Sequence, residues 1–101
     1  MASEAKWKTQ RRASKAQITA ASNRVDAIAN ETMTDVLEYE LENLIARVEK
    51  HWEIGHRLTE KILEVIPDSD DAKLAEELKN RDEVENTVFK CKMTAQSIIK
   101  D

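Results

Sequence analysis

The sequence predicts an all-α protein, folded as an elongated antiparallel three-helix bundle or a coiled-coil-like helical hairpin. The first observation is that its 101 residues include one glycine and one proline, too few for the closely spaced turns of a β-sheet. The second is that apolar residues recur at alternating steps of three and four, the rhythm of a helical seam. We expect one domain over residues 1–101, with helices at about 4–30, 33–66 and 69–99.

The first helix is predicted by a seam that strengthens along its length. Its seam positions are Trp7, Arg11, Ser14, Ile18, Ala21, Val25 and Ile28. Two of the first three are polar, so the seam is firmly apolar only from Ile18 onwards. The stretch NETMTD then interrupts the pattern, and Thr32 is interpreted as the N-cap of the next helix, with Thr34 as a rival. One continuous helix that bends here is the alternative.

The second helix has the clearest pattern. Its seam positions are Leu37, Leu41, Leu44, Val48, His51, Gly55, Leu58, Ile62 and Val65, and Val36, Ile45, Trp52 and Ile66 widen the stripe. The opposite face is rich in glutamate, lysine and arginine. A helix of this length, roughly 50 Å at about 1.5 Å per residue, is ordinary for a coiled-coil-like bundle.

The third helix follows a sharp reversal. Pro67 cannot continue a helix, and the next three residues, Asp68, Ser69 and Asp70, all suit an N-cap. Its apolar stripe comprises Leu74, Leu78, Val84, Val88, Cys91, Ala95 and Ile98, with Phe89 and Met93 on the flank. Because so few residues join the second and third helices, the two must run antiparallel.

A basic segment at 1–15 precedes an acidic body. Residues 1–25 carry a net charge of +5 within a chain whose formal net charge is −4. The candidate polyanion-binding residues are Lys6, Lys8, Arg11, Arg12 and Lys15. In a helix most of them form one positive stripe, which could bind RNA, DNA or an anionic lipid surface. The competing interpretation is a solvated face, or a stripe whose charges pair with the acidic faces of the other two helices.

Five residues are candidates for packing or for an interaction: Trp7, Trp52, Gly55, Leu58 and Phe89. The glycine is the most informative of them. A mid-helix glycine costs about 1 kcal/mol relative to alanine. We expect Gly55 to give room to a bulky side chain from a neighbouring helix, and a flexible point in the long helix is the alternative.

The sequence offers no constellation for catalysis. His51 and His56 lie about 140° apart around a helix axis, at about 100° per residue, so they cannot share a metal ion. Cys91 lies on the apolar stripe, which favours a buried residue over a reactive thiol. We therefore predict no enzyme, no catalytic residue, no metal site and no cofactor. The lack of a long apolar run predicts no transmembrane segment and a cytoplasmic location.

The order of the segments resembles the N-terminal helical region of the Gag polyprotein of BEL/Pao-type LTR retrotransposons. A basic stretch leads into a K-x-x-I-T-like segment, here Lys15 to Thr19. A leucine- and glutamate-rich helix with a central aromatic follows, and then an acidic helix with an aromatic near its end. The resemblance covers about residues 11–100, and neither a zinc knuckle nor a capsid segment is present.

The resemblance implies a structural domain with a role in particle assembly, from an active element or a domesticated copy. We therefore expect a non-enzymatic protein that binds protein partners and itself. A nucleic-acid-binding module that acts through the basic segment is the first alternative. A host coiled-coil adaptor is the second.

Overall fold

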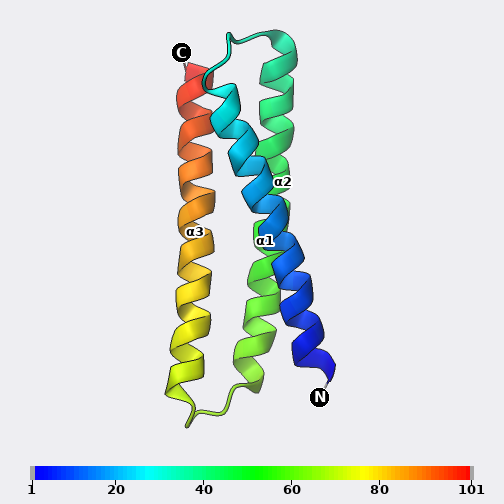
Figure 1. Cartoon of the computed structure of the whole chain (residues 1–101), viewed down its shortest axis with the longest axis vertical. Helices are drawn as coiled ribbons and strands as arrows, with labels where there is room; N and C mark the ends of the chain where they lie inside the picture. Colours follow the sequence, from blue (N-terminus) through cyan, green and yellow to red (C-terminus); the bar gives the residue numbers. More distant parts are fainter. Residues whose placement is uncertain (1, 101) are drawn as a thin grey trace.

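The computed structural model describes residues 2–100, and the side chains of residues 4–99. Its three helices are α1 (Ala2–Ile28), α2 (Asp35–Val65) and α3 (Asp71–Lys100). They run up, down and up along a rod of 52 × 22 × 15 Å (Figure 1). This arrangement confirms the predicted all-α bundle, and each helix end lies within two residues of its predicted place.

Side-chain caps fix where α2 and α3 begin. The backbone N–H of Leu37 donates to the hydroxyl oxygen of Thr34 at 3.2 Å, so Thr34, the rival of Thr32, is the N-cap of α2. At the start of α3, Asp70 accepts a hydrogen bond from the backbone N–H of Lys73 at 3.1 Å. Both caps satisfy backbone donors that a helix start leaves without partners.

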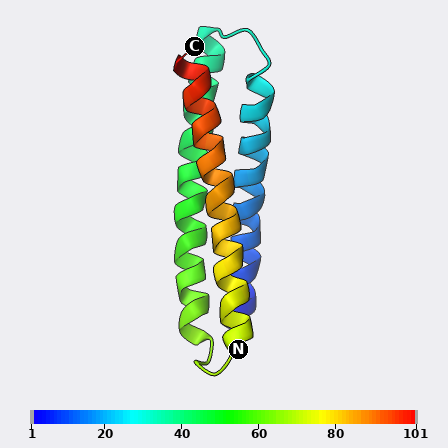
Figure 2. The same ribbon diagram turned by 90° about the vertical axis from the view of Figure 1, so that its left-hand side faces the viewer.

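The main core lies where all three helices meet. α1 packs most extensively against α2, and α3 lies alongside this pair (Figure 2). The core residues are Ile18, Ala21, Val25, Ile28, Leu41, Leu44, Val48, Val88, Cys91 and Ala95. All ten occupy predicted seam positions, so the three-four rhythm correctly identified the inward face of each helix.

Two predicted seam residues face solvent instead. At the end of the bundle where α2 turns into α3, α1 and α3 lie farther apart than at the other end (Figure 1), and Lys73 bridges them through an ion pair with Glu4 at 3.3 Å. At this wider end of the bundle the Leu74 side chain is 37% exposed. At the end of α2, Val65 is half exposed, and the following Ile66 is buried in its place.

An ion pair joins α1 to α2 near their connecting loop. Arg24 donates from Nε and Nη2 to the two carboxylate oxygens of Glu40, at 2.6 and 2.9 Å. The hydrogen bonds from Arg24 hold the pKa of Glu40 below its ordinary value. Glu40 therefore contributes stability above its unfolded-state pKa of about 4.3, and this contribution is lost as the pH falls through the lower folded-state pKa.

Replacing Glu40 with glutamine should lower the melting temperature at neutral pH, with the difference from wild type shrinking as the solution becomes strongly acidic. Thermal melts followed by circular dichroism over a pH series measure this. Glu42→Gln is the matched control, because Glu42 is exposed on the same helix and has no ion-pair partner among residues 4–99. A difference that stayed constant with pH would contradict the role of the Glu40 charge.

Candidate functional site

The basic segment is an integral part of α1 rather than a separate arm. Helical structure begins at Ala2, and the segment packs against the end of the bundle where α2 turns into α3. Lys6, Arg12 and Lys15 are exposed, whereas Lys8 and Arg11 are partly buried. The five candidate polyanion-binding cations are thus divided between exposed and partly buried positions.

Arg11 forms an ion pair inside the bundle. Its guanidinium donates to both carboxylate oxygens of Glu77 on α3, with Nη2 and Oε1 3.3 Å apart. Nη1 also lies 3.4 Å from the hydroxyl oxygen of Thr59 on α2. The Glu77 side chain is only 5% exposed and that of Arg11 is 19% exposed. Arg11 therefore joins all three helices, as the interpretation of an internally paired stripe expected.

The sequence interpretation missed Glu77 and Arg81. A charged residue within a helical pattern is usually assigned to the surface, and the seam of α3 was traced through Leu74 and Leu78 instead. The steps of three and four that connect the apolar residues from Val84 onwards continue backwards to Arg81 and Glu77. That shared register was the available signal, and it predicts that Glu77 and Arg11 face the same interior.

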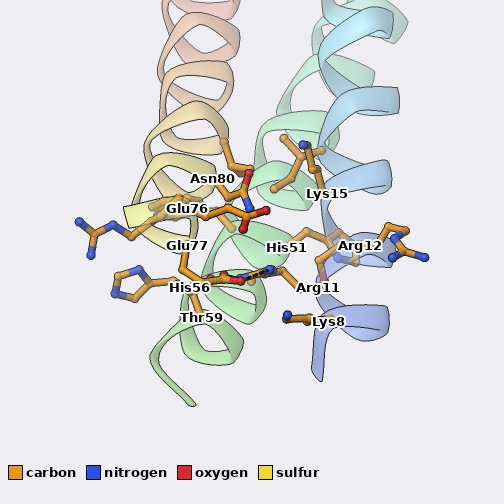
Figure 3. A pocket seen from close by; sticks show the side chains of 16 residues that line it. Lys8, Arg11, Arg12, Lys15, His51, His56, Thr59, Glu76, Glu77 and Asn80 are labelled. Atoms are coloured by element: carbon orange, nitrogen blue, oxygen red, sulfur yellow. Dashed lines mark hydrogen bonds and ion pairs between the residues drawn. The ribbon is translucent and has the colours of Figure 1, made fainter. Parts of the chain in front are cut away.

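A cavity of about 260 Å³ lies beside this ion pair. Its floor is formed by buried residues of all three helices: Ser14, Ile18, Thr59 and Glu77. Figure 3 shows side chains of α1 on one side, Glu76, Glu77 and Asn80 of α3 on the other, and residues of α2 between them. Ile18, the first residue of the main core, also lines the cavity, which therefore lies at the edge of that core.

Gly55 lines the cavity and does not pack against a bulky neighbour. A Cβ atom built at this position meets nothing within 4 Å. The prediction that a bulky side chain from a neighbouring helix packs against Gly55 is therefore wrong. The physical reason is that α1 and α3 diverge at this end, so that the seam position of Gly55 faces empty space (Figure 1).

Gly55→Ala should raise the free energy of unfolding by about 0.5–1 kcal/mol. Alanine improves the helix propensity, and its methyl group enters open space without a clash. Urea denaturation at equilibrium measures the change. Ala46→Gly, at an exposed position of the same helix, should shift stability by a similar amount in the opposite direction. A destabilised Gly55→Ala protein would contradict the open geometry.

The two histidines and Trp52 form the α2 wall of the cavity. The ring centroids of Trp52 and His56 are 5.7 Å apart, and Nε2 of His56 lies 3.1 Å from a carboxylate oxygen of Glu60. Nδ1 of both His51 and His56 is covered by protein atoms and has no hydrogen-bond partner. Within residues 2–100 no cluster of three or more histidine, cysteine or acidic residues could hold a metal ion.

Trp7 and Leu58 contribute to packing at this end of the bundle. The Nζ atom of Lys61 on α2 lies 5.9 Å from the centroid of the Trp7 ring, a cation–π geometry. Leu58 is 6% exposed, as its seam position predicted. Trp7 is partly buried, and its ring already contacts Lys61 of α2, so it contributes to packing within the bundle.

A second surface feature lies at the other end of the bundle, between α1 and α3. The Phe89 side chain is 62% exposed and that of Met93 54% exposed, one turn apart on α3. They border a hollow of about 420 Å³ that also includes Asp26 and Lys90. Met93 borders a second hollow of about 590 Å³, which includes Met33. We call this surface, defined by Phe89, Met93 and the two hollows, the apolar face.

Cys91 faces inward beneath the apolar face. Its side chain is 2% exposed, and burial raises the pKa of its thiol. The interpretation of Cys91 as a core residue is confirmed. Burial and the raised pKa both disfavour the thiolate form, which is the reactive form of a cysteine.

Comparison with protein-family models, curated proteins and solved structures finds no match for this chain. The similarity to the Gag region consequently stays a prediction from the sequence. Among residues 2–100, no helix is long and apolar enough to span a bilayer.

Proposed function

We propose that this chain is a non-enzymatic interaction domain that self-associates through its apolar face. The observation that carries the proposal is the exposed Phe89, which lies beside a hollow on the same surface. An exposed aromatic ring next to a concave surface is typical of the centre of a protein interface, where such rings contribute most of the binding energy.

A second copy of the chain is the partner that this face fits best. A two-fold symmetric interface requires one surface to be complementary to itself. The apolar face has both a projecting ring and a hollow, so Phe89 of one copy can enter the hollow of the other. Asp26 and Lys90, of opposite charge, border the same hollow and can pair reciprocally across the symmetry axis.

The Gag-like origin is part of the same proposal. The order of a basic first helix, a leucine-rich second helix and an acidic third helix supports it, and self-association is what an assembly domain requires. A cytoplasmic location follows from that origin. A host coiled-coil adaptor and a nucleic-acid-binding module are the alternatives. The ion pair with Glu77 weighs against a nucleic-acid-binding module, because it already neutralises Arg11, one of the candidate polyanion-binding cations.

Phe89→Ala should weaken self-association by about 30-fold or more, the effect of losing an interface hot spot. Sedimentation equilibrium, or size-exclusion chromatography with light scattering at high micromolar concentration, measures it. Tyr39→Ala is the matched control, because Tyr39 is an aromatic residue of α2 that is 68% exposed outside the apolar face. A wild-type protein that stays monomeric at high micromolar concentration would refute the proposal.

A further inference from the structure

The cavity beside the Arg11–Glu77 ion pair combines positive charge with an apolar wall. Its lining contains five cationic side chains and two carboxylates, Glu76 and Glu77. Since Glu77 is paired with Arg11, four cations remain against the single exposed carboxylate of Glu76. These four are Lys8, Arg12, Lys15 and Arg81. An excess of one charge in a partly enclosed space of low dielectric concentrates the field and attracts the opposite charge.

The four cations differ in how far they are already neutralised. Nζ of Lys8 lies 3.4 Å from a carboxylate oxygen of Glu4. Nε of Arg81 lies 3.8 Å from a carboxylate oxygen of Asp82. Arg12 extends away from the cavity in Figure 3. Lys15 borders the cavity and has no ion-pair partner among residues 4–99. Lys15 is therefore the cation best placed to bind an anionic group at the mouth of the cavity.

The rest of the lining suits the uncharged part of a small ligand. Trp52, Ile18 and Val84 supply apolar surface, and Gly55 leaves the adjoining space open. The hydroxyl group of Thr59 and the amide of Asn80 supply hydrogen-bonding groups. A volume of about 260 Å³ far exceeds the space of one water molecule and lies just below the range of about 300–1,000 Å³ usual for ligand pockets.

We propose that this cavity binds a small organic anion, with a phosphate or carboxylate group near Lys15 and an apolar body against Trp52 and the backbone of Gly55. Two features support an enclosed ligand over a surface-bound polymer. Part of the positive stripe of α1 faces inward, and the one glycine of the chain is at the position where a side chain would fill the space. The site lies at the opposite end of the bundle from the apolar face, so it is independent of self-association.

The fluorescence of Trp52 provides a direct test. Trp7→Phe leaves Trp52 as the only tryptophan, and Trp52 lines the cavity whereas Trp7 does not. We expect a saturable fluorescence change when this protein is titrated with phenyl phosphate or benzoate. Inorganic phosphate should bind more weakly, because it lacks the apolar body, and benzyl alcohol should not compete, because it lacks the charge. The absence of saturation with both organic anions would overturn the proposal.

Matched variants locate the site. Lys15→Gln should weaken binding about tenfold, since a charge-assisted contact is lost. Lys6→Gln is its control, because it removes the same charge from the same helix at an exposed position outside the cavity. Equal losses in the two variants would show nonspecific attraction and contradict the site.

Gly55→Leu should abolish binding by filling the space, while circular dichroism shows that the helices are retained. Gly55→Ala is the smaller companion and should still bind, so a folding defect in the leucine variant does not decide the outcome. A short single-stranded RNA serves as the competitor. If it displaces phenyl phosphate and binds the Gly55→Leu protein as tightly as wild type, the cations bind a polymer on the surface. That result would overturn the enclosed site.

Discussion

Glu77→Ala is expected to lower the free energy of unfolding by about 2–4 kcal/mol, which corresponds to a fall in melting temperature on the order of 10–20 °C for a domain of this size. The variant leaves the guanidinium of Arg11, only 19% exposed, without its carboxylate partner. A charge that is shielded from water and unpaired is costly. The expected loss is below that of a fully buried pair because water still reaches Arg11.

The matched control is Glu76→Ala, which removes the same group from the adjacent exposed position of α3. Its effect should stay within about 0.5 kcal/mol. Urea denaturation of both variants provides the comparison, and equal effects would contradict a structural role for the pair.

Replacing both partners by apolar residues, as in the double variant Arg11→Met with Glu77→Leu, separates the pair's contribution from the penalty of breaking it. A buried ion pair can often be replaced by apolar residues at little or no loss of stability. We expect the double variant to be more stable than Glu77→Ala. A double variant less stable than Glu77→Ala would contradict the penalty of the unpaired guanidinium, whereas one less stable than wild type would show that the pair itself stabilises the bundle.

Leu41→Ala is expected to lower the free energy of unfolding by about 2–5 kcal/mol, the range for large-to-small substitutions in cores. Leu41 is 0% exposed and belongs to the main core. Because small domains have a total stability of about 5–15 kcal/mol, this one change could remove a large share of it.

Val36→Ala is the control for Leu41→Ala. Val36 lies in the same helix but is 76% exposed, so its truncation should change stability by no more than about 0.5 kcal/mol. Denaturation midpoints in urea measure both variants. Comparable losses would mean that the core does not lie where the three helices meet.

The inward face of each helix could be predicted because the three-four rhythm depends only on local geometry. Even Arg11 and Ser14, polar residues at seam positions, face the interior as the rhythm requires. The exact cap could not be predicted, since Thr32 and Thr34 have the same chemistry and only their place relative to the first turn of α2 distinguishes them.

The cavity could not be predicted because it depends on how far apart the helices lie. A seam pattern shows which face of a helix is turned inward, and it does not show the distance to the next helix. Gly55 illustrates the difference: its position in the seam was correct, and the prediction that a neighbour would fill the space was wrong because α1 and α3 diverge there. Glu77 was missed for a different reason. Its charge suggested a surface position, although its place in the three-four rhythm of α3 pointed to the interior.

The odd number of helices has a mechanical consequence. In the up-down-up arrangement the first residues of α1 and the last residues of α3 lie at opposite ends of the 52 Å rod (Figure 1). A force applied at these two places would act along the helix axes and slide the helices past one another, instead of peeling one from the next. Sliding loads the whole length of each interface together, so tension at these two places would be shared along the helices.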